Sequence, residues 1–225
     1  MNKLIKNKIY IFFKLLIQKN SLLRTLQILE CLNLSLRGKS IEFGAFKNKK
    51  KNFSYFIKKK QFFQYSNIFT DKKNNIIFND LTKKLKIKNN SYNNVLLFNV
   101  LEHLPDFKLT FKEINRIMKK NSYFIGSVPF LYQIHGAPKD YFRFTSQFFE
   151  FYFKKNNFKI KKIKSLGFGP FIACYSLIYP YISLIPFLKI IFLLVAILLD
   201  SFIQLFVKTD LKTIFPIGIF FIVKK

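Results

Sequence analysis

The sequence predicts an α/β fold with a mostly parallel sheet, and three observations lead to it. Short apolar runs of strand length recur from residue 40 onward, and segments with helical spacing of apolar residues separate several of them. The run NNVLLFNV at 93–100 is almost continuously apolar, which is typical of a strand buried on both faces of a parallel sheet. A chain of 225 residues that is 50% hydrophobic suffices for one such domain with an insertion.

Each element follows from a local pattern. Pro105 favours a helix start, and apolar residues at helical spacing continue from 107 to 119. Thr145 is a good N-cap for a second helix over 145–156. Because strands alternate with helices, we expect helices on both faces of the sheet. The predicted strands are 40–44, 62–69, 75–80, 93–100, 123–130, 158–168 and 213–225.

The N-terminal part differs from the rest. Residues 3–33 have apolar side chains at helical spacing with Lys and Arg between them, which predicts a basic amphipathic helix or a pair of helices. Two interpretations stay open, since such a helix either covers one face of the sheet or lies in a membrane surface. No export signal is expected, because the apolar stretch is short and a small-residue cleavage site is missing. We therefore expect an amphipathic helical segment, 1–37, and a main domain, 38–225.

The chain is strongly basic, with a formal charge of +28 from 39 Lys and Arg against 11 Asp and Glu. Such a charge is typical of partners such as nucleic acid or an anionic membrane. Lys, Asn, Ile and Phe are in excess together, however, so much of this charge is expected to be solvated surface, and nucleic acid is not an expected partner. Cys31 and Cys174 lie far apart in the sequence and lack metal-ligand spacing. We therefore expect both to be reduced thiols of a cytoplasmic protein.

The middle of the chain carries a recognisable pattern. A strand ends in LEH (101–103), the next helix contains Glu113, Arg116 and Lys119, and the following strand ends in Pro129. This stretch resembles a class I S-adenosylmethionine-dependent methyltransferase of type 11. HGAPKDYFRFT (135–145) resembles a signature of members associated with polysaccharide gene clusters. The resemblance covers roughly residues 38–168.

This resemblance implies a Rossmann-like sheet of seven strands in the order 3-2-1-4-5-7-6. The last strand, 213–225, would then lie antiparallel between strands five and six. The implied cofactor is S-adenosylmethionine, and the implied reaction is methyl transfer to a hydroxyl of a glycan precursor or of another small or lipid-linked metabolite. The alternative is a binding or scaffold protein that keeps the fold but has lost the cofactor loop.

The resemblance also implies a cofactor site. Glu42 and Gly44 match the start of the family's glycine-rich loop, whereas Phe46 and Asn48 stand where its second and third glycines would be. A Phe46 ring that filled the pocket would favour the scaffold alternative. Asp80 matches the position that holds the adenine amino group, although it also suits a turn cap. The cofactor-binding residues expected are Glu42, Gly44, Asp71, Asp80 and Asn99.

His103 and His135 are the candidate catalytic residues. The family places His103 just past the carboxyl end of the fourth strand, where a neutral imidazole can take a proton from an acceptor hydroxyl. The alternative is that Glu102 and His103 only hold the loop. Related quinone methyltransferases bind a metal through ExxEH, but Asn99 replaces the first Glu here, so no metal site is expected.

The segment after the fifth strand is expected on the acceptor side of the site. Arg143 suits an anionic group of the acceptor, and Tyr141 suits a ring. Asp140 is expected beside them, with an internal pair between Asp140 and Arg143 as the other interpretation. These residues predict a small-molecule or glycan substrate.

Residues 170–208 form an apolar insertion before the last strand. A single membrane span is excluded if the last strand joins the same sheet, and Lys189 and Asp200 interrupt the run. We therefore expect a helical hairpin that turns near Pro186. It would cap the cleft, form a homo-oligomer interface, or lie in a membrane surface, with Tyr175, Tyr179 and Tyr181 at the lipid boundary. The last case makes the protein peripheral on the inner membrane face.

Overall fold

The computed structural model of the protein describes residues 3–18, 20–136, 139–182 and 185–225. The chain forms two compact units. The helical unit comprises Met1–Leu29, Pro129–Ile134 and Ser165–Ile219. The sheet unit comprises Glu30–Val128, His135–Lys164 and Phe220–Lys225. Each unit is described by itself.

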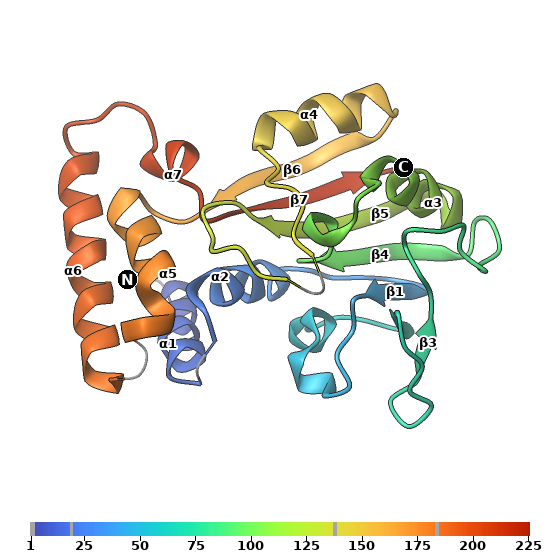
Figure 1. The fold of residues 1–225 in the computed structure, drawn as a ribbon, viewed down its shortest axis with the longest axis horizontal. Helices are drawn as coiled ribbons and strands as arrows, with labels where there is room; N and C mark the ends of the chain where they lie inside the picture. The colour runs from blue at the N-terminus through green and yellow to red at the C-terminus, as the bar shows by residue number, and fades with distance from the viewer. Residues whose placement is uncertain (1–2, 19, 137–138, 183–184) are drawn as a thin grey trace. The chain divides into compact units, whose positions relative to one another are not determined.

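A mixed sheet of seven strands has the order β3-β2-β1-β4-β5-β7-β6 (Figure 1). The pairs β1–β2, β1–β4, β2–β3 and β4–β5 are parallel. β7 runs the opposite way to β5, since the N–H of Asn121 donates to the carbonyl of Lys225 and that of Phe130 to Ile217. The predicted order is confirmed. The strands are β1 (Ser40–Phe43), β2 (Phe63–Asn67), β3 (Ile76–Phe78), β4 (Tyr92–Phe98), β5 (Met118–Pro129), β6 (Lys159–Leu166) and β7 (Gly218–Lys224).

Strand register brings three loops to one edge of the sheet. Phe43, the last residue of β1, pairs with Ser66 in β2 and with Leu97 in β4. The carboxyl ends of these strands therefore coincide, and the chain leaves all of them at the same edge. Ligands of open α/β sheets bind at this edge.

Aromatic side chains form the core of the sheet unit on both faces. On one face, Phe111 of α3 (Phe107–Ile117) and Phe153 of α4 (Ser146–Lys155) both contact the ring of Phe124 in β5. On the opposite face, Phe53 stacks on Phe98 in β4 with ring centroids 4.2 Å apart. Buried aromatic pairs of this kind add about 0.5–1.5 kcal/mol each beyond their area.

The last predicted strand is shorter in the structure, and the connection from β1 to β2 has no long helix. The connection from β1 to β2 contains only the 3-10 turns η1 (Lys49–Lys51) and η2 (Phe53–Phe56). The final strand begins at Gly218 instead of residue 213, because α7 (Leu211–Ile214) precedes it. Pro216 has no N–H to give to a strand ladder, which accounts for the late start.

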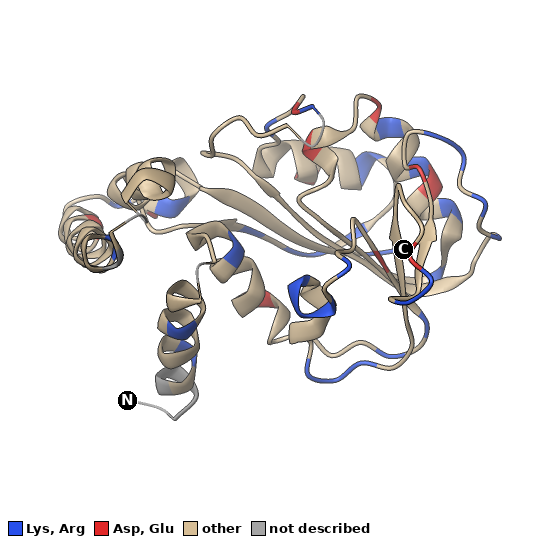
Figure 2. Cartoon of the chain, turned by 60° about the horizontal axis from the view of Figure 1, so that its bottom comes forward, with Lys and Arg blue, Asp and Glu red and all other residues tan. Residues whose placement is uncertain are grey.

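The helical unit contains α1 (Lys3–Ile17), most of α2 (Leu22–Cys31), and the hairpin of α5 (Pro170–Ile182) and α6 (Pro186–Gln204). The predicted helical insertion before the last strand is confirmed. Lys and Arg are spread over helices and loops of both units (Figure 2).

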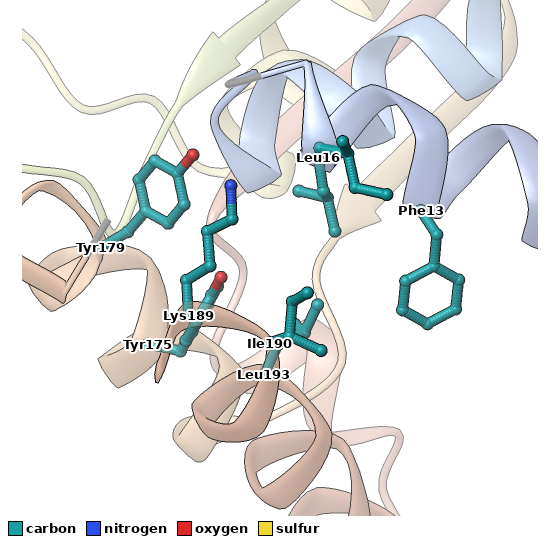
Figure 3. Close-up of a pocket in the computed structure, with 8 residues that line it drawn as sticks. Phe13, Leu16, Tyr175, Tyr179, Lys189, Ile190 and Leu193 are labelled. Atoms are coloured by element: carbon teal, nitrogen blue, oxygen red, sulfur yellow. The ribbon is translucent and has the colours of Figure 1, made fainter. Parts of the chain in front are cut away.

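The two charges that interrupt the apolar run both face the interior of the helical unit. Asp200 is buried, and its carboxylate accepts the backbone N–H groups of Phe171 and Ile172, each at 2.9 Å. These N–H groups belong to the first turn of α5 and have no partner within the helix. Lys189 is half-buried beside a cavity of about 30 Å³ that Tyr175 and Tyr179 also line (Figure 3). Neither charge therefore breaks the outer face of α6.

Candidate functional site

A cavity of about 660 Å³ lies within the sheet unit at the carboxyl ends of the strands. Its walls come from segments that follow four strands and from the loop after β5. The lining includes Gly44 and Phe46 after β1, Asn67 and Ile68 at and after the end of β2, Phe78–Thr82 at and after β3, Asn99, Val100, His103, Leu104 and Pro105 after β4, and Lys139 and Tyr141 from the loop. Four of the predicted site residues that line it come from separate segments: Gly44, Asp80, Asn99 and Tyr141.

Gly44 lets two of these segments approach closely. Its φ is +71°, and a Cβ at this position would lie 2.6 Å from Cγ2 of Val100. Side chains rarely adopt this backbone conformation, and glycine does so without steric cost. The turn after β1 can therefore touch the segment after β4 only because residue 44 has no side chain.

Glu42 has a different position from the one predicted. Its side chain is buried, and its carboxylate accepts the backbone N–H groups of Phe53 at 2.8 Å and of Ser54 at 3.0 Å. Glu42 is not among the residues that line the cavity. It shapes the connection from β1 to β2 from beneath, because two hydrogen bonds to a carboxylate fix the turn at residues 53–54.

The residues that replace the family's glycines are fixed by Asn side chains. Buried Asn52 accepts the N–H of Phe46 at 2.7 Å and donates to its carbonyl at 3.3 Å. Asn48 caps η1 by accepting the N–H of Lys50. The side chain of Phe46 is 47% exposed and forms part of the cavity wall. A cavity of the stated volume is present beside this ring, so the ring does not fill the pocket.

Asp80 combines the two roles considered for it, as a lining residue and a turn cap. Oδ1 accepts the N–H of Thr82 at 2.9 Å and its hydroxyl at 2.6 Å, and this hydroxyl bond is the main cause that lowers the pKa of Asp80. Oδ2 lies 3.6 Å from Nζ of Lys83. Asp71 is not a lining residue, since its carboxylate accepts the backbone N–H and the side-chain amide of Asn74.

Asn99 follows β4 with φ +52° and lines the cavity. Its backbone N–H donates to the carbonyl of Ser127 at 2.8 Å, which extends the pairing of β4 with β5 by one residue. Asn tolerates the left-handed conformation better than other non-glycine residues do. The chain can therefore turn at residue 99 into the 3-10 turn η3 (Leu101–His103).

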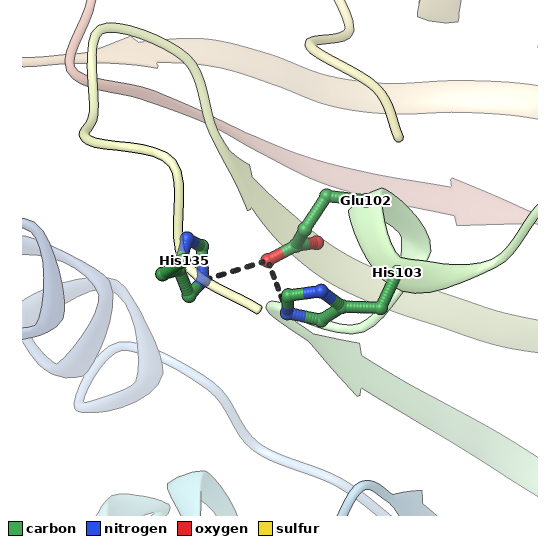
Figure 4. A group of neighbouring side chains, drawn as sticks. All are labelled: Glu102, His103 and His135. Atoms are coloured by element: carbon green, nitrogen blue, oxygen red, sulfur yellow. Dashed lines mark ion pairs between the residues drawn. The ribbon is translucent and has the colours of Figure 1, made fainter. Parts of the chain in front are cut away.

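Glu102, His103 and His135 form a cluster beside this cavity (Figure 4). Oε1 of Glu102 lies 3.7 Å from Nε2 of His103 and 4.0 Å from Nε2 of His135. The two imidazole rings meet edge to face, with centroids 4.9 Å apart. His103 belongs to the cavity lining as well, so the cluster and the cavity share a wall.

Glu102 is completely buried, and neither carboxylate oxygen has a hydrogen-bond partner among the described residues. Burial raises the pKa of Glu102 to about 8. A buried carboxylate without a donor is costly to keep charged. A cation or a hydrogen-bond donor bound next to Glu102 would therefore stabilise its charged form.

The loop after β5 is held against η3 by backbone and side-chain contacts. The carbonyl of Glu102 accepts the N–H of Tyr141 at 2.7 Å. Asp140 pairs with Arg143 (Nη2–Oδ2 2.7 Å) and accepts the N–H of His135 at 3.0 Å. The Arg143 guanidinium holds the pKa of Asp140 at about 2. Of the three predicted acceptor residues, only Tyr141 lines the cavity, while Asp140 and Arg143 fix the loop.

Sequence reasoning treated Glu102 as a loop residue, although it is the centre of the cluster. A carboxylate directly before a histidine at the end of a buried strand was the available signal. Lys139 was also missed. Its carbonyl accepts a hydrogen bond from Nδ1 of His103 at 2.6 Å, and a backbone contact of this kind leaves no trace in the sequence.

Part of the chain matches a known family model. Residues 59–126 match the family model described as a methyltransferase domain. Among curated proteins, none matches the chain.

Solved structures of S-adenosylmethionine-dependent methyltransferases share the fold. One from Thermotoga maritima is 14% identical, with 93% of this chain and 92% of that chain covered and a TM-score of 0.55. One from Mesorhizobium loti is 10% identical, with 87% and 95% covered and a TM-score of 0.54. One from Archaeoglobus fulgidus is 12% identical, with 83% and 86% covered and a TM-score of 0.52.

Identities this low establish the fold, and the family match places a methyltransferase domain within it. The chain therefore has the fold of S-adenosylmethionine-dependent methyltransferases, and its residues 59–126 match the methyltransferase-domain family.

Proposed function

We propose that this chain is an S-adenosylmethionine-dependent methyltransferase that transfers a methyl group to a hydroxyl of a glycan precursor or other lipid-linked metabolite at an anionic membrane surface. The observation that carries the proposal is the Glu102–His103–His135 cluster, which borders the cavity at the sheet edge. The exposed apolar face of α6 supports the membrane location.

The residues of the cavity fit the cofactor. A volume of about 660 Å³ lies within the ~300–1,000 Å³ of small-molecule sites. Without a side chain at Gly44, the backbone can approach a ligand closely. Asp80, whose Oδ2 is free of the turn cap, would hold the adenine amino group, and Asn99 would bind nearby. When bound, S-adenosylmethionine supplies a methyl group already activated on a positively charged sulfur.

On the acceptor side, the residues must orient a hydroxyl and assist the loss of its proton. The Glu102–His103–His135 cluster is the place for this, because His103 faces both Glu102 and the cavity. Tyr141 lines the same wall and would contact the acceptor. Asp140 and Arg143 would act as positioning residues, since they hold the backbone of His135 in place. Alignment of the acceptor oxygen supplies much of the catalysis in such reactions.

The helical unit suits a membrane surface. α6 is long and apolar enough to cross a bilayer, yet only 17% of Phe187–Gln204 is buried. Exposed apolar patches of this size mark interaction sites on soluble proteins. The face is defined by large side chains on α6 and just beyond it, including Phe187, Leu198, Phe202, Leu205 and Phe206.

The hairpin lies on one side of a membrane. α6 has 19 residues and α5 has 13, so they span about 28 Å and about 20 Å. α5 is too short to return across a ~30 Å core. Basic residues of α1, among them Lys8 and Lys14, would attract an anionic leaflet at about 1 kcal/mol each. This arrangement is that of a protein peripheral on the inner membrane face.

The test is methyl transfer from radiolabelled S-adenosylmethionine to a glycolipid fraction and to a matched set of water-soluble glycans. We expect label in the lipid phase, and Phe202→Glu should reduce it while cofactor binding by calorimetry stays unchanged. Label in soluble glycans alone would contradict the membrane acceptor. Cofactor binding without transfer to either pool would contradict the proposed acceptor class.

A further inference from the structure

We propose that Glu102, His103 and His135 form a binding site for one divalent transition-metal ion of the zinc class. The binding itself is independent of the proposed function. Only the role of the ion rests on that function, because the ion would hold the oxygen of the methyl acceptor.

The three ligand atoms converge on one point. One ligand atom from each of the three residues lies within 4.8 Å of the other two. In a tetrahedral site with metal–ligand distances of about 2.1 Å, such atoms lie about 3.4 Å apart. The separations of 3.7 Å and 4.0 Å from Oε1 therefore exceed the expected spacing by only a few tenths of an ångström. Small side-chain rotations would close the site around an ion.

The outer contacts of the two imidazoles orient them for metal binding. Nδ1 of His103 donates to the carbonyl of Lys139 at 2.6 Å. Nδ1 of His135 lies 3.3 Å from Oδ2 of Asp140, which as a carboxylate accepts a hydrogen. Metal-binding histidines nearly always give their second ring N–H to a carbonyl or a carboxylate. Both partners are present here before any ion binds.

This arrangement leaves a place that a cation would fill. With both Nδ1 atoms protonated, the lone pairs of both Nε2 atoms face the carboxylate of Glu102 (Figure 4). That carboxylate is buried and has no hydrogen-bond partner among the described residues. One cation at this point would be bound by the lone pairs of both Nε2 atoms and by the buried carboxylate at once.

The donor set indicates the kind of ion. Two imidazoles and one carboxylate bind zinc and neighbouring divalent metals, and catalytic sites keep a position open beside three protein ligands. The side chain of Glu102 is fully buried, whereas those of His103 and His135 are 11% and 32% exposed. The open side of the site therefore faces away from Glu102, and His103 joins it to the cavity.

Sequence spacing alone pointed away from this site. Asn99 stands where a related motif has its first Glu, so the pattern around residues 99–103 lacks a ligand. In the structure the third ligand comes from His135, on the loop after β5. The role that follows is to hold an acceptor oxygen at the open position and to lower the pKa of its hydroxyl, whose proton passes to water.

The test is titration of the untagged full-length protein with Co²⁺ in the absence of S-adenosylmethionine, followed by displacement with Zn²⁺. We expect one site with visible absorption of low-symmetry Co²⁺. Glu102→Gln and His135→Asn should each weaken binding by more than about 100-fold, since each removes a ligand rather than an outer partner. Cys174→Ser is the control, because this exposed thiol is an alternative ligand, and its loss should change nothing.

The chain contains two histidines, so a tag-free protein has no other imidazole site. Circular dichroism of each variant separates loss of a ligand from loss of the fold. Co²⁺ binding that both variants retain, or no saturable binding by a folded wild type, would overturn the inference. Metal binding without methyl transfer would support the metal site and contradict the proposed function. Full transfer activity after removal of the metal by a chelator would contradict the proposed role of the ion, and the histidines alone would then take the proton.

Discussion

The backbone N–H of Ile217 donates to the carbonyl of Leu166 at 2.8 Å. This single hydrogen bond joins the residue that ends β6 to the residue that precedes β7. The two ends of the apolar insertion therefore meet at one place. A chain that leaves and returns at one place cannot cross a bilayer once, because the ends would then lie ~30 Å apart.

The first prediction concerns the face of α6. The intact protein should float with anionic liposomes, and Leu198→Glu and Phe202→Glu should each lower the membrane partition coefficient by about 10–100-fold. Each substitution removes a large apolar side chain from lipid, which is worth ~1.5–3 kcal/mol. Phe62→Glu is the matched control, since Phe62 is 80% exposed but lies in the sheet unit, and it should bind as the wild type does.

Salt should weaken this binding only in part, because the apolar contribution does not depend on ionic strength. A wild type that stays unbound but sediments as a dimer would show that a second copy covers α6. A monomer that binds neither anionic nor neutral vesicles would rule out both occupants.

The second prediction concerns Asp200. Asp200→Ala should lower the free energy of unfolding by about 1.5–3 kcal/mol, because two buried N–H groups at the start of α5 lose a charged acceptor. Urea denaturation in mild detergent would measure the change. Asp210→Ala removes a similar cap from the four-residue helix α7, where the carboxylate is 49% exposed. That variant should lose much less, and equal losses would show that burial of Asp200 does not matter.

The third prediction concerns the cofactor. Asp80→Ala should weaken S-adenosylmethionine binding by about 1–3 kcal/mol, as expected when a hydrogen bond to a charged group is lost. Calorimetry would measure it, with Asp71→Ala as the control. Asp71 lies in a turn outside the cavity lining, so its loss should leave the affinity unchanged. Unchanged affinity in Asp80→Ala would remove Asp80 from the cofactor site.

The fourth prediction concerns acid stability. Burial alone would raise the pKa of Glu30, but hydrogen bonds from Lys162 and Lys164 outweigh it and lower this pKa below 4.5. A depressed folded-state pKa stabilises the protein above the unfolded-state value, and the contribution is lost as pH falls through the folded-state value. Glu30→Gln should therefore lower stability by about 1 kcal/mol at about pH 7, since both lysines are partly exposed. Urea unfolding should show that this difference shrinks below about pH 4.

Much of the fold was predictable because local patterns dictate it. The apolar run at 93–100 predicted buried strand β4, and Thr145 predicted the start of α4, where its hydroxyl accepts the N–H of Phe148 at 3.0 Å. The order of the strands came from the family resemblance. The start of β7 was placed too early, because Pro216 ends the ladder and a short helix takes the residues before it.

The site was predictable only in part. Gly44, Asp80 and Asn99 each follow a strand, and parallel strands bring their carboxyl ends to one edge. Glu42 precedes the end of β1 and points into the loop that it holds.

The sequence by itself determined the alternation of strands and helices, the apolar insertion, and the residues at the ends of the strands, because these depend on local periodicity. Only the tertiary structure decided that His135 lies against Glu102, and that Lys189 and Asp200 face inward and leave α6 apolar outside. Such pairings join residues far apart in the chain. They depend on how a loop folds back and how a helix rotates about its axis, and spacing within a sequence does not encode either.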